Sequence, residues 1–240
     1  MRTLKRLDVF APVNPCRVYG FQEFNEPTDN PEGWTIEEVL NGKKREQQAF
    51  TDPVMAVKAF LEHEEWRDQI GNYVSNSIVP NLSAWVVDIP TSEIPALTTR
   101  RDNYANCNDS DVSDEIDEFG SFLPVEQCLF HGGRLLVVGD RLEKPLSLTV
   151  NPQVAYAEGL RNASLNNWGE FAIFIFTVMS PRVKSFTYDL TTEMRHELEV
   201  IVTRGTTVSD RRKRFSIQQQ LRNGNGTRPI TVSVVTAELI

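Results

Sequence analysis

The spacing of apolar and polar positions divides the chain into a helix-rich first part and a strand-rich second part. Residues 51–74 offer Thr51 or Asp52 as an N-cap and Pro53 at the first helical position, and apolar side chains then recur at helical spacing. This pattern predicts a helix with one buried face. A second, shorter helix is predicted over 33–50, while 81–90 is typical of a short strand or a buried segment closed by Pro90.

After residue 120 the apolar runs become short and rich in β-branched and aromatic residues, which is typical of strands. Asn151 and Pro152 open a short helix over 151–160. Strands are predicted over 126–133, 144–150, 171–179, 197–208, 214–220 and 229–239. Several strands with few helices between them, preceded by helices, predict an α+β fold with a mixed or antiparallel β core.

Three regions follow from this pattern. Residues 1–100 form a helical N-terminal region that either braces the core or docks a partner, and residues 121–240 form the core. Between them, 101–120 is predicted to be an acidic exposed loop. Asp109, Asp111 and Asp114 have the oxygen-rich spacing of a calcium loop, but the glycine and the final glutamate that such a loop requires are not in place.

Composition narrows the class of protein. Hydrophobic residues make up 40% of the 240 residues and charged residues 24%, which is ordinary for a soluble globular protein. The formal net charge of −8 argues against nucleic acid as the main partner, and the basic run 211–214 is more typical of a solvated turn. The chain has no membrane-spanning apolar run and no secretory signal pattern, so we expect no membrane partner and a cytoplasmic location.

Few residues suited to metal binding are present. The chain has 3 Cys and 3 His, scattered and without a His-x-x-x-His pair, so a metal site is not expected. The cysteines also indicate a reducing compartment rather than a disulfide framework.

Residues suited to chemistry follow one another in order along the strand-rich part. His131 and Gly132 lie at the end of the strand "LFHGG", and Ser147 with "SLT" follows on the next predicted strand. The pair Glu197 and Glu199 then opens "EVIVTRGTTV". Residues two apart on a strand share a face, so two carboxylates lie side by side. Close like charges predict a raised pKa for one of them; the alternative is a solvated strand edge that discourages aggregation.

These motifs together resemble the mono-ADP-ribosyltransferase family, over roughly residues 123–240, with "ELE" as its Glu-x-Glu motif. The resemblance implies an enzyme of the glycosyltransferase class that uses NAD as co-substrate. Such an enzyme transfers ADP-ribose to a target protein, with arginine as the expected acceptor, and releases nicotinamide. A phage protein or a bacterial effector acting inside a cell fits this size.

The resemblance also implies roles for single residues. Glu199 stabilises the positive charge on the ribose and Glu197 faces the acceptor, so these two are the expected catalytic residues. The other implied contacts are with NAD. Ser147 aims Glu199, Thr149 supports the pocket, and the backbone of Gly132 approaches the nicotinamide amide. His131 bonds a ribose hydroxyl and Arg134 contacts phosphate.

The first strand departs from the pattern of the arginine-modifying members, which carry arginine where this chain has His131. The diphtheria-toxin and poly-ADP-ribose polymerase branch has histidine there, but pairs it with tyrosine rather than with Ser-x-Thr. The mixed set leaves open the alternative of a catalytically degenerate binding protein, or a virion-associated structural protein, on the same fold.

Overall fold

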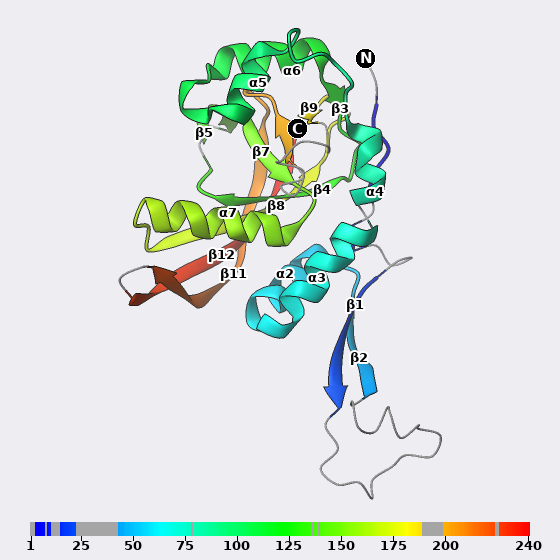
Figure 1. The fold of residues 1–240 in the computed structure, drawn as a ribbon, viewed down its shortest axis with the longest axis vertical. Helices are drawn as coiled ribbons and strands as arrows, with labels where there is room; N and C mark the ends of the chain where they lie inside the picture. Colours follow the sequence, from blue (N-terminus) through cyan, green and yellow to red (C-terminus); the bar gives the residue numbers. More distant parts are fainter. Residues whose placement is uncertain are drawn as a thin grey trace, which may run out of the picture.

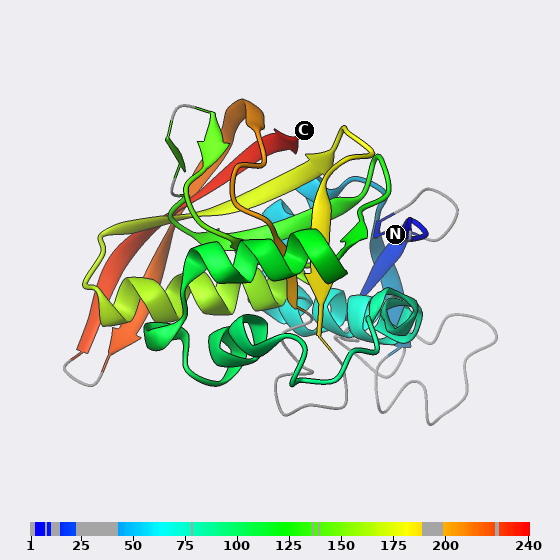
Figure 2. The same ribbon diagram turned by 90° about the horizontal axis from the view of Figure 1, so that it is seen from above.

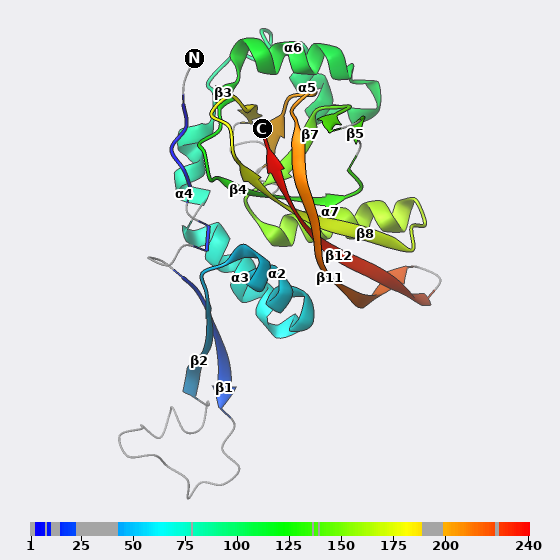
Figure 3. The same ribbon diagram turned by 180° about the vertical axis from the view of Figure 1, so that it is seen from behind.

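The computed structural model describes residues 3–7, 9–10, 15–22, 43–77, 79–135, 137–138, 140–188, 199–223 and 226–240. An eight-stranded mixed sheet forms the centre of the molecule, with helices α5, α6 and α7 on one side of it (Figures 1 and 2). The two-stranded sheet β1–β2 projects beyond α2 and α3, as seen from the front and from behind (Figures 1 and 3). The predicted α+β class and mixed β core are confirmed.

The strand order of the sheet is β11–β12–β8–β4–β7–β10–β9–β3. Strands β12 and β8 pair in parallel, and the other neighbours in this sheet pair antiparallel. The strands span Ser121–Phe122 (β3), Cys128–Gly133 (β4), Leu146–Thr149 (β7), Glu170–Val178 (β8), Lys184–Thr187 (β9), Glu199–Val202 (β10), Val208–Asn223 (β11) and Gly226–Leu239 (β12).

The helix predicted over 51–74 exists, but as two helices. Helix α2 (Pro53–Glu62) has the predicted cap, since Asp52 accepts a hydrogen bond from the Met55 amide at 2.9 Å. It ends at His63, whose backbone is extended, and α3 (Glu64–Ser77) begins at the next residue. Both helices bury apolar side chains in the main core.

Two segments of the N-terminal region differ from the helix and the strand predicted for them. Residues Lys43–Phe50, predicted as part of a helix, form strand β2, which pairs antiparallel with β1 (Cys16–Gln22); residues 33–42 lie outside the described residues. Pairing with the distant strand β1 outweighs the local helical pattern here, and the sequence of the segment itself gives no sign of that partner. Residues 81–90, predicted as a short strand or a buried segment, are helical at their start, in α4 (Val79–Leu82) and the 3-10 turn η1 (Ser83–Trp85), and bury Leu82 and Trp85.

The predicted acidic loop over 101–120 is largely helical. Helix α6 (Asp109–Phe119) has Asn108 as its N-cap. Acidic residues in its first turn stabilise the helix, because their negative charge lies at the positive end of the helix dipole. Val112 and Ile116, four residues apart, face a buried cluster with Phe186 and Ile201. The exposed acidic residues Asp111, Asp114, Asp117 and Glu118 therefore lie on the outer side of an amphipathic helix, whereas Asp109 and Glu115 are partly buried. Helix α5 (Pro95–Asp102) and the 3-10 turn η2 (Tyr104–Asn106) precede it.

The strand-rich part follows the prediction closely. Helix α7 (Pro152–Leu165) begins after Asn151, as expected, but is longer than predicted. The segment predicted as one strand over 197–208 is divided: residues 199–202 form β10, and β11 begins at 208 and contains the exposed basic run 211–214. A small sheet of β5 (Val137–Val138) and β6 (Arg141–Leu142) was not predicted. None of the described helices is long and apolar enough to cross a membrane.

Candidate active site

A cavity of about 530 Å³ opens between helices α5 and α7 and the sheet strands β4, β7 and β10. This volume lies within the range of small-molecule sites, roughly 300–1,000 Å³. Of the described residues, those that line it are Arg100, Arg101, Tyr104, Phe130, His131, Gly132, Arg134, Lys144, Pro145, Leu146, Ser147, Leu148, Thr149, Val154, Ala155, Glu158, Arg161, Asn162 and Glu199.

The residues singled out in the sequence meet at this cavity. They come from strand β4, the turn after it, β7 and β10, and they are His131, Gly132, Arg134, Ser147, Thr149 and Glu199. Glu197, the other predicted catalytic residue, lies outside the described residues. The structure thus brings together six of the seven predicted site residues, and their roles stay predictions.

Sheet register places Glu199 beside the hydroxyl residues of the neighbouring strand. In the antiparallel pair β10–β7, Glu199 is opposite Thr149 and Ile201 is opposite Ser147. Ser147 is therefore the diagonal neighbour of Glu199, within reach of a long side chain. On its other side β7 pairs with β4 through Thr149 and Phe130, which brings His131 next to the same cavity.

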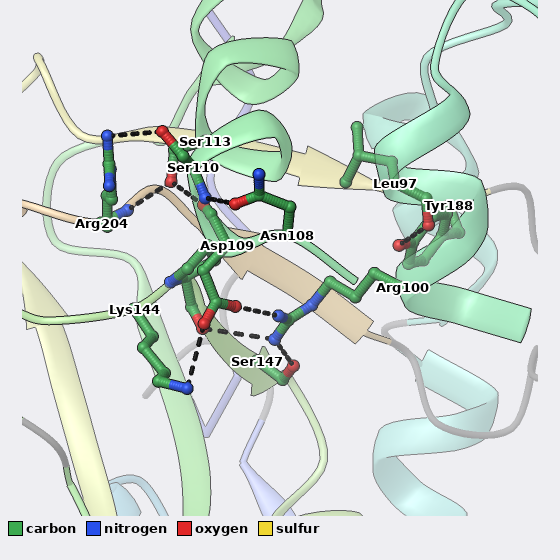
Figure 4. A network of polar contacts seen from close by, with 11 residues as sticks. Leu97, Arg100, Asn108, Asp109, Ser110, Ser113, Lys144, Ser147, Tyr188 and Arg204 are labelled. Atoms are coloured by element: carbon green, nitrogen blue, oxygen red, sulfur yellow. Dashed lines mark hydrogen bonds and ion pairs between the residues drawn. The ribbon is translucent and has the colours of Figure 1, made fainter. Parts of the chain in front are cut away.

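Arg100 reaches Ser147 from helix α5 (Figure 4). Its Nη2 donates to Ser147 Oγ at 3.0 Å and to the Pro145 carbonyl oxygen at 3.2 Å. Its Nη1 lies 3.6 Å from Asp109 Oδ1, and Lys144 Nζ lies 3.1 Å from Asp109 Oδ2. Arg100 is only 4% exposed. A buried guanidinium with this partner set has its charge balanced on one side by Asp109 while it holds strand β7 on the other.

The environment of Glu199 favours the protonated carboxyl more than water does. Burial raises the pKa of Glu199, and the negative charge of Glu158 on α7 acts in the same direction. A hydrogen bond with Ser147 and the positive charge of Arg100 oppose this increase. Among the described residues, the negative charge that raises the pKa of Glu199 is therefore Glu158, which was not among the residues singled out in the sequence. A carboxylate kept partly desolvated and aimed by hydrogen bonds is suited to stabilising a cation that forms nearby.

The surroundings of His131 favour its neutral imidazole. Burial lowers the pKa of His131, while the backbones of Ser147 and Arg134 oppose this. Its Nδ1 lies 2.9 Å from the Ser147 carbonyl oxygen, which can only accept, so Nδ1 carries the proton. Nε2 is then an acceptor, and no described residue hydrogen-bonds to this buried atom.

Two of the predicted site residues, Gly132 and Thr149, also make contacts that stabilise the fold around the cavity. A Cβ on Gly132 would lie 1.6 Å from the carbonyl oxygen of Ala155, so glycine here lets α7 pack directly against β4. Thr149 is buried, and its Oγ1 accepts a hydrogen bond from the Asn151 amide at 3.1 Å, at the turn that leads into α7. Contact of Gly132 with nicotinamide and support of the pocket by Thr149 remain predictions beside these packing roles.

Positive charge predominates around the cavity. Among the described lining residues, five are cationic (Arg100, Arg101, Arg134, Lys144 and Arg161) and two are carboxylates (Glu158 and Glu199). Arg134 lies with its Cζ 4.4 Å from the centre of the Trp168 ring, a cation–π contact that limits its side-chain freedom. Arg161 forms an ion pair with Glu158. Such a wall suits a diphosphate, and a carboxylate near the floor suits a sugar that becomes cationic.

Sequence analysis missed Arg100 and the cavity face of α7. The latter carried a signal: Val154, Glu158, Arg161 and Asn162 lie at spacings of four, three and one along a predicted helix, which places them on one face. Because α7 starts directly after β7, that face had to lie near Ser147 and Thr149. Arg100 carried no comparable signal, since the prediction had no element over α5.

No protein-family model matches the sequence, and no curated protein matches it either. Solved structures with similar folds include BECa, the ADP-ribosylating toxin of a binary enterotoxin of C. perfringens, crystallised with NADH, at 12% identity and a TM-score of 0.37. The match covers 83% of this chain and 51% of BECa, so the chain spans about half of that protein.

Two smaller toxins are matched over most of their length. Vis, an ADP-ribosyltransferase from Vibrio splendidus, is 15% identical, with 78% of this chain and 91% of Vis covered and a TM-score of 0.38. C3larvin, an ADP-ribosyltransferase from Paenibacillus larvae, is 10% identical, with 78% and 92% covered and a TM-score of 0.28. Because these TM-scores are below 0.5, the case for an activity depends on the residues of the cavity.

Proposed function

We propose that the protein is an NAD-dependent mono-ADP-ribosyltransferase that transfers ADP-ribose from NAD to a protein side chain, with arginine as the acceptor. The observation that carries the proposal is the convergence of His131, Ser147 and Glu199 on one cavity, although each was identified separately in the sequence. The cationic wall of that cavity supports the choice of a dinucleotide.

Each residue has a role that its surroundings support. Glu199 stabilises the positive charge that grows on the ribose as the bond to nicotinamide breaks, and nicotinamide leaves as a neutral molecule with the bonding electron pair. Ser147 orients Glu199, and Nε2 of His131 accepts a hydrogen bond from a ribose hydroxyl. Arg134 contacts the diphosphate. Backbone contact of Gly132 with the nicotinamide amide completes the binding set.

The acceptor step requires a second carboxylate, and we assign it to Glu197. Its carboxylate would face the guanidinium of the target, orient one nitrogen towards the ribose C1′ and take the proton that this nitrogen loses on forming the new C–N bond. Two variants would distinguish this step from the first. Glu197→Gln should lower transfer to an arginine acceptor far more than it lowers hydrolysis of NAD by water. Glu199→Gln should abolish both reactions.

The deciding experiment incubates the protein with NAD labelled on the adenylate, with agmatine or a lysate as acceptor, and follows labelled product and released nicotinamide. Glu199→Gln should reduce both by at least ~100-fold, since removing one group that stabilises transition-state charge commonly costs 10²–10³-fold. Glu170→Gln is a matched control, because Glu170 is an exposed carboxylate at the start of β8. Equal turnover by wild type and Glu199→Gln would refute the proposal.

The degenerate alternative is tested by the same material. A binding or structural protein without the activity would release no nicotinamide, and calorimetric titration would then report whether NAD still binds. Binding that is lost in Arg134→Ala, but without turnover in wild type, would identify a degenerate NAD site.

A further inference from the structure

Arg100 lies outside the motifs of the strand-rich part, yet it is the buried cation at the centre of the site. It belongs to α5, a helix before the predicted core, and it enters the wall of the cavity with 4% of its surface exposed. Its Cζ lies 4.8 Å from the centre of the Tyr104 ring, and Asp109 contacts the guanidinium from the first turn of α6. The side chain is therefore contacted from both η2 and α6.

The hydrogen bonds of Arg100 restrict Ser147 to one role. Nη2 donates to Ser147 Oγ at 3.0 Å and also to the Pro145 carbonyl oxygen at 3.2 Å, so one nitrogen joins two positions of the β7 segment. Once Ser147 Oγ accepts from arginine, which has no acceptor atom, the hydroxyl hydrogen is left to donate elsewhere. Glu199 is the carboxylate within its reach, as the diagonal neighbour on β10.

From this geometry we infer that Arg100 is a positioning residue, which acts on Glu199 through Ser147 and makes the α5–α6 layer part of the catalytic apparatus. The inference rests on the proposed function for its kinetic consequences, but not for its structural content. The contacts form a series in the order Lys144, Asp109, Arg100, Ser147 and Glu199. Positive and negative side chains alternate from Lys144 to Arg100, and the Ser147 hydroxyl then connects Arg100 to Glu199, so each member has an opposite charge or a donor beside it.

The electrostatic consequence has a definite sign. The groups that act electrostatically on Glu199 are Arg100 from α5, Glu158 from α7 and Tyr188 after β9. The other charged and titratable groups that line the cavity are Arg101, Tyr104, His131, Arg134, Lys144 and Arg161. Of these, Arg100 lowers the pKa of Glu199. Removing Arg100 should therefore raise the Glu199 pKa, and the acid limb of activity, which requires the carboxylate, should move to higher pH.

The test compares Arg100→Met, Arg100→Lys and Ser147→Ala with wild type, using the pH profile of NAD hydrolysis. We expect Arg100→Met to lower kcat by on the order of 100-fold with little change in KM, as for a misplaced catalytic group. Its acid limb should move to higher pH, and Arg100→Lys should restore the limb but not the full kcat. Arg182→Gln removes the same charge from an exposed residue that does not line the cavity, and it should leave the limb in place.

A double-mutant cycle tests whether Arg100 acts through Ser147. If it does, Arg100→Met should cost little further kcat in the Ser147→Ala background, whereas additive losses would overturn the inference. Thermal unfolding of each variant shows whether it is folded. Should Arg100→Met fail to fold, the same cycle with Arg100→Lys gives the answer.

A measurement without NAD separates this inference from the proposed function. In protein labelled with ¹³C at the glutamate carboxyls, the Glu199 signal is assigned by its loss in Glu199→Gln and titrated in wild type and Arg100→Met. A higher pKa in Arg100→Met, together with no NAD turnover in wild type, would refute the function and support the positioning role. An unchanged Glu199 titration in an active enzyme would overturn the positioning role alone.

Discussion

Substitution of Gly132 by alanine tests the closest contact between the helix and the sheet of the site. The new Cβ would lie 1.6 Å from the Ala155 carbonyl oxygen and 3.0 Å from the Gly159 amide nitrogen. Since a carbon and a carbonyl oxygen normally approach to about 3.3 Å, α7 would have to move by roughly 1.7 Å. The obstructing atoms are backbone, so no side-chain rotation can relieve the overlap.

We expect Gly132→Ala to cost about 3 kcal/mol or more, at or above the upper end of the usual range for overpacking. For a chain of this length that corresponds to a fall in Tm of roughly 6–12 °C, measured by circular dichroism. NAD turnover should fall as well, because α7 carries one wall of the cavity. An additional Ala155→Gly change should give no rescue.

The control is Gly169→Ala, because a Cβ at position 169 has no atom within 4 Å. Its Tm should stay within the range of an ordinary surface substitution, about 0.5 kcal/mol either way. If Gly132→Ala and Gly169→Ala unfold at the same temperature, the argument for direct helix-to-strand packing at this position is incorrect.

Three further outcomes are expected. Glu115 accepts hydrogen bonds from two backbone amides at the start of α5, at 2.8 and 2.7 Å, so Glu115→Ala should destabilise the protein by about 1–3 kcal/mol, measured by urea unfolding; Glu118→Ala is the exposed control on the same helix. Burial raises the pKa of the Cys16 and Cys128 thiols to about 12, so a disulfide reagent at pH 8 should react rapidly with Cys107 alone, and with three thiols after unfolding. Because the Glu199 pKa is raised, the stability of wild type relative to Glu199→Gln should fall as pH rises from the ordinary carboxyl value near ~4.3 through the folded pKa. The difference in Tm between wild type and Glu199→Gln should therefore shift in favour of the variant from pH 4 to pH 7, and the same difference at both pH values would contradict this.

The sequence was most informative where local pattern and tertiary structure agree. Strands β4, β7 and β8 are short apolar runs buried within the sheet, and α7 begins with an asparagine cap followed by proline, so each was predictable from neighbouring residues alone. The order of these elements was sufficient to bring His131, Ser147 and Glu199 to one cavity.

Prediction failed where a distant partner decides the structure. Strand β2 is polar and reads as helical, yet it pairs with β1, and its last residue Phe50 is buried. The acidic composition of α6 concealed its apolar positions, Val112 and Ile116, because charge count was given more weight than spacing. Arg100 could not be found in this way, since an arginine near the end of a helix is usually solvated and its burial depends on β7 and α6.

The assembly of the site from widely separated elements has a kinetic consequence. Arg100 and Glu199 are 99 positions apart, and Ser147 lies between them in the chain but on the strand that joins them in space. Contacts of such long sequence separation form late and slowly, because the loop between them must first be closed. During refolding from denaturant, helix content should therefore return before NAD turnover, and the return of turnover should coincide with the final ordering of the sheet.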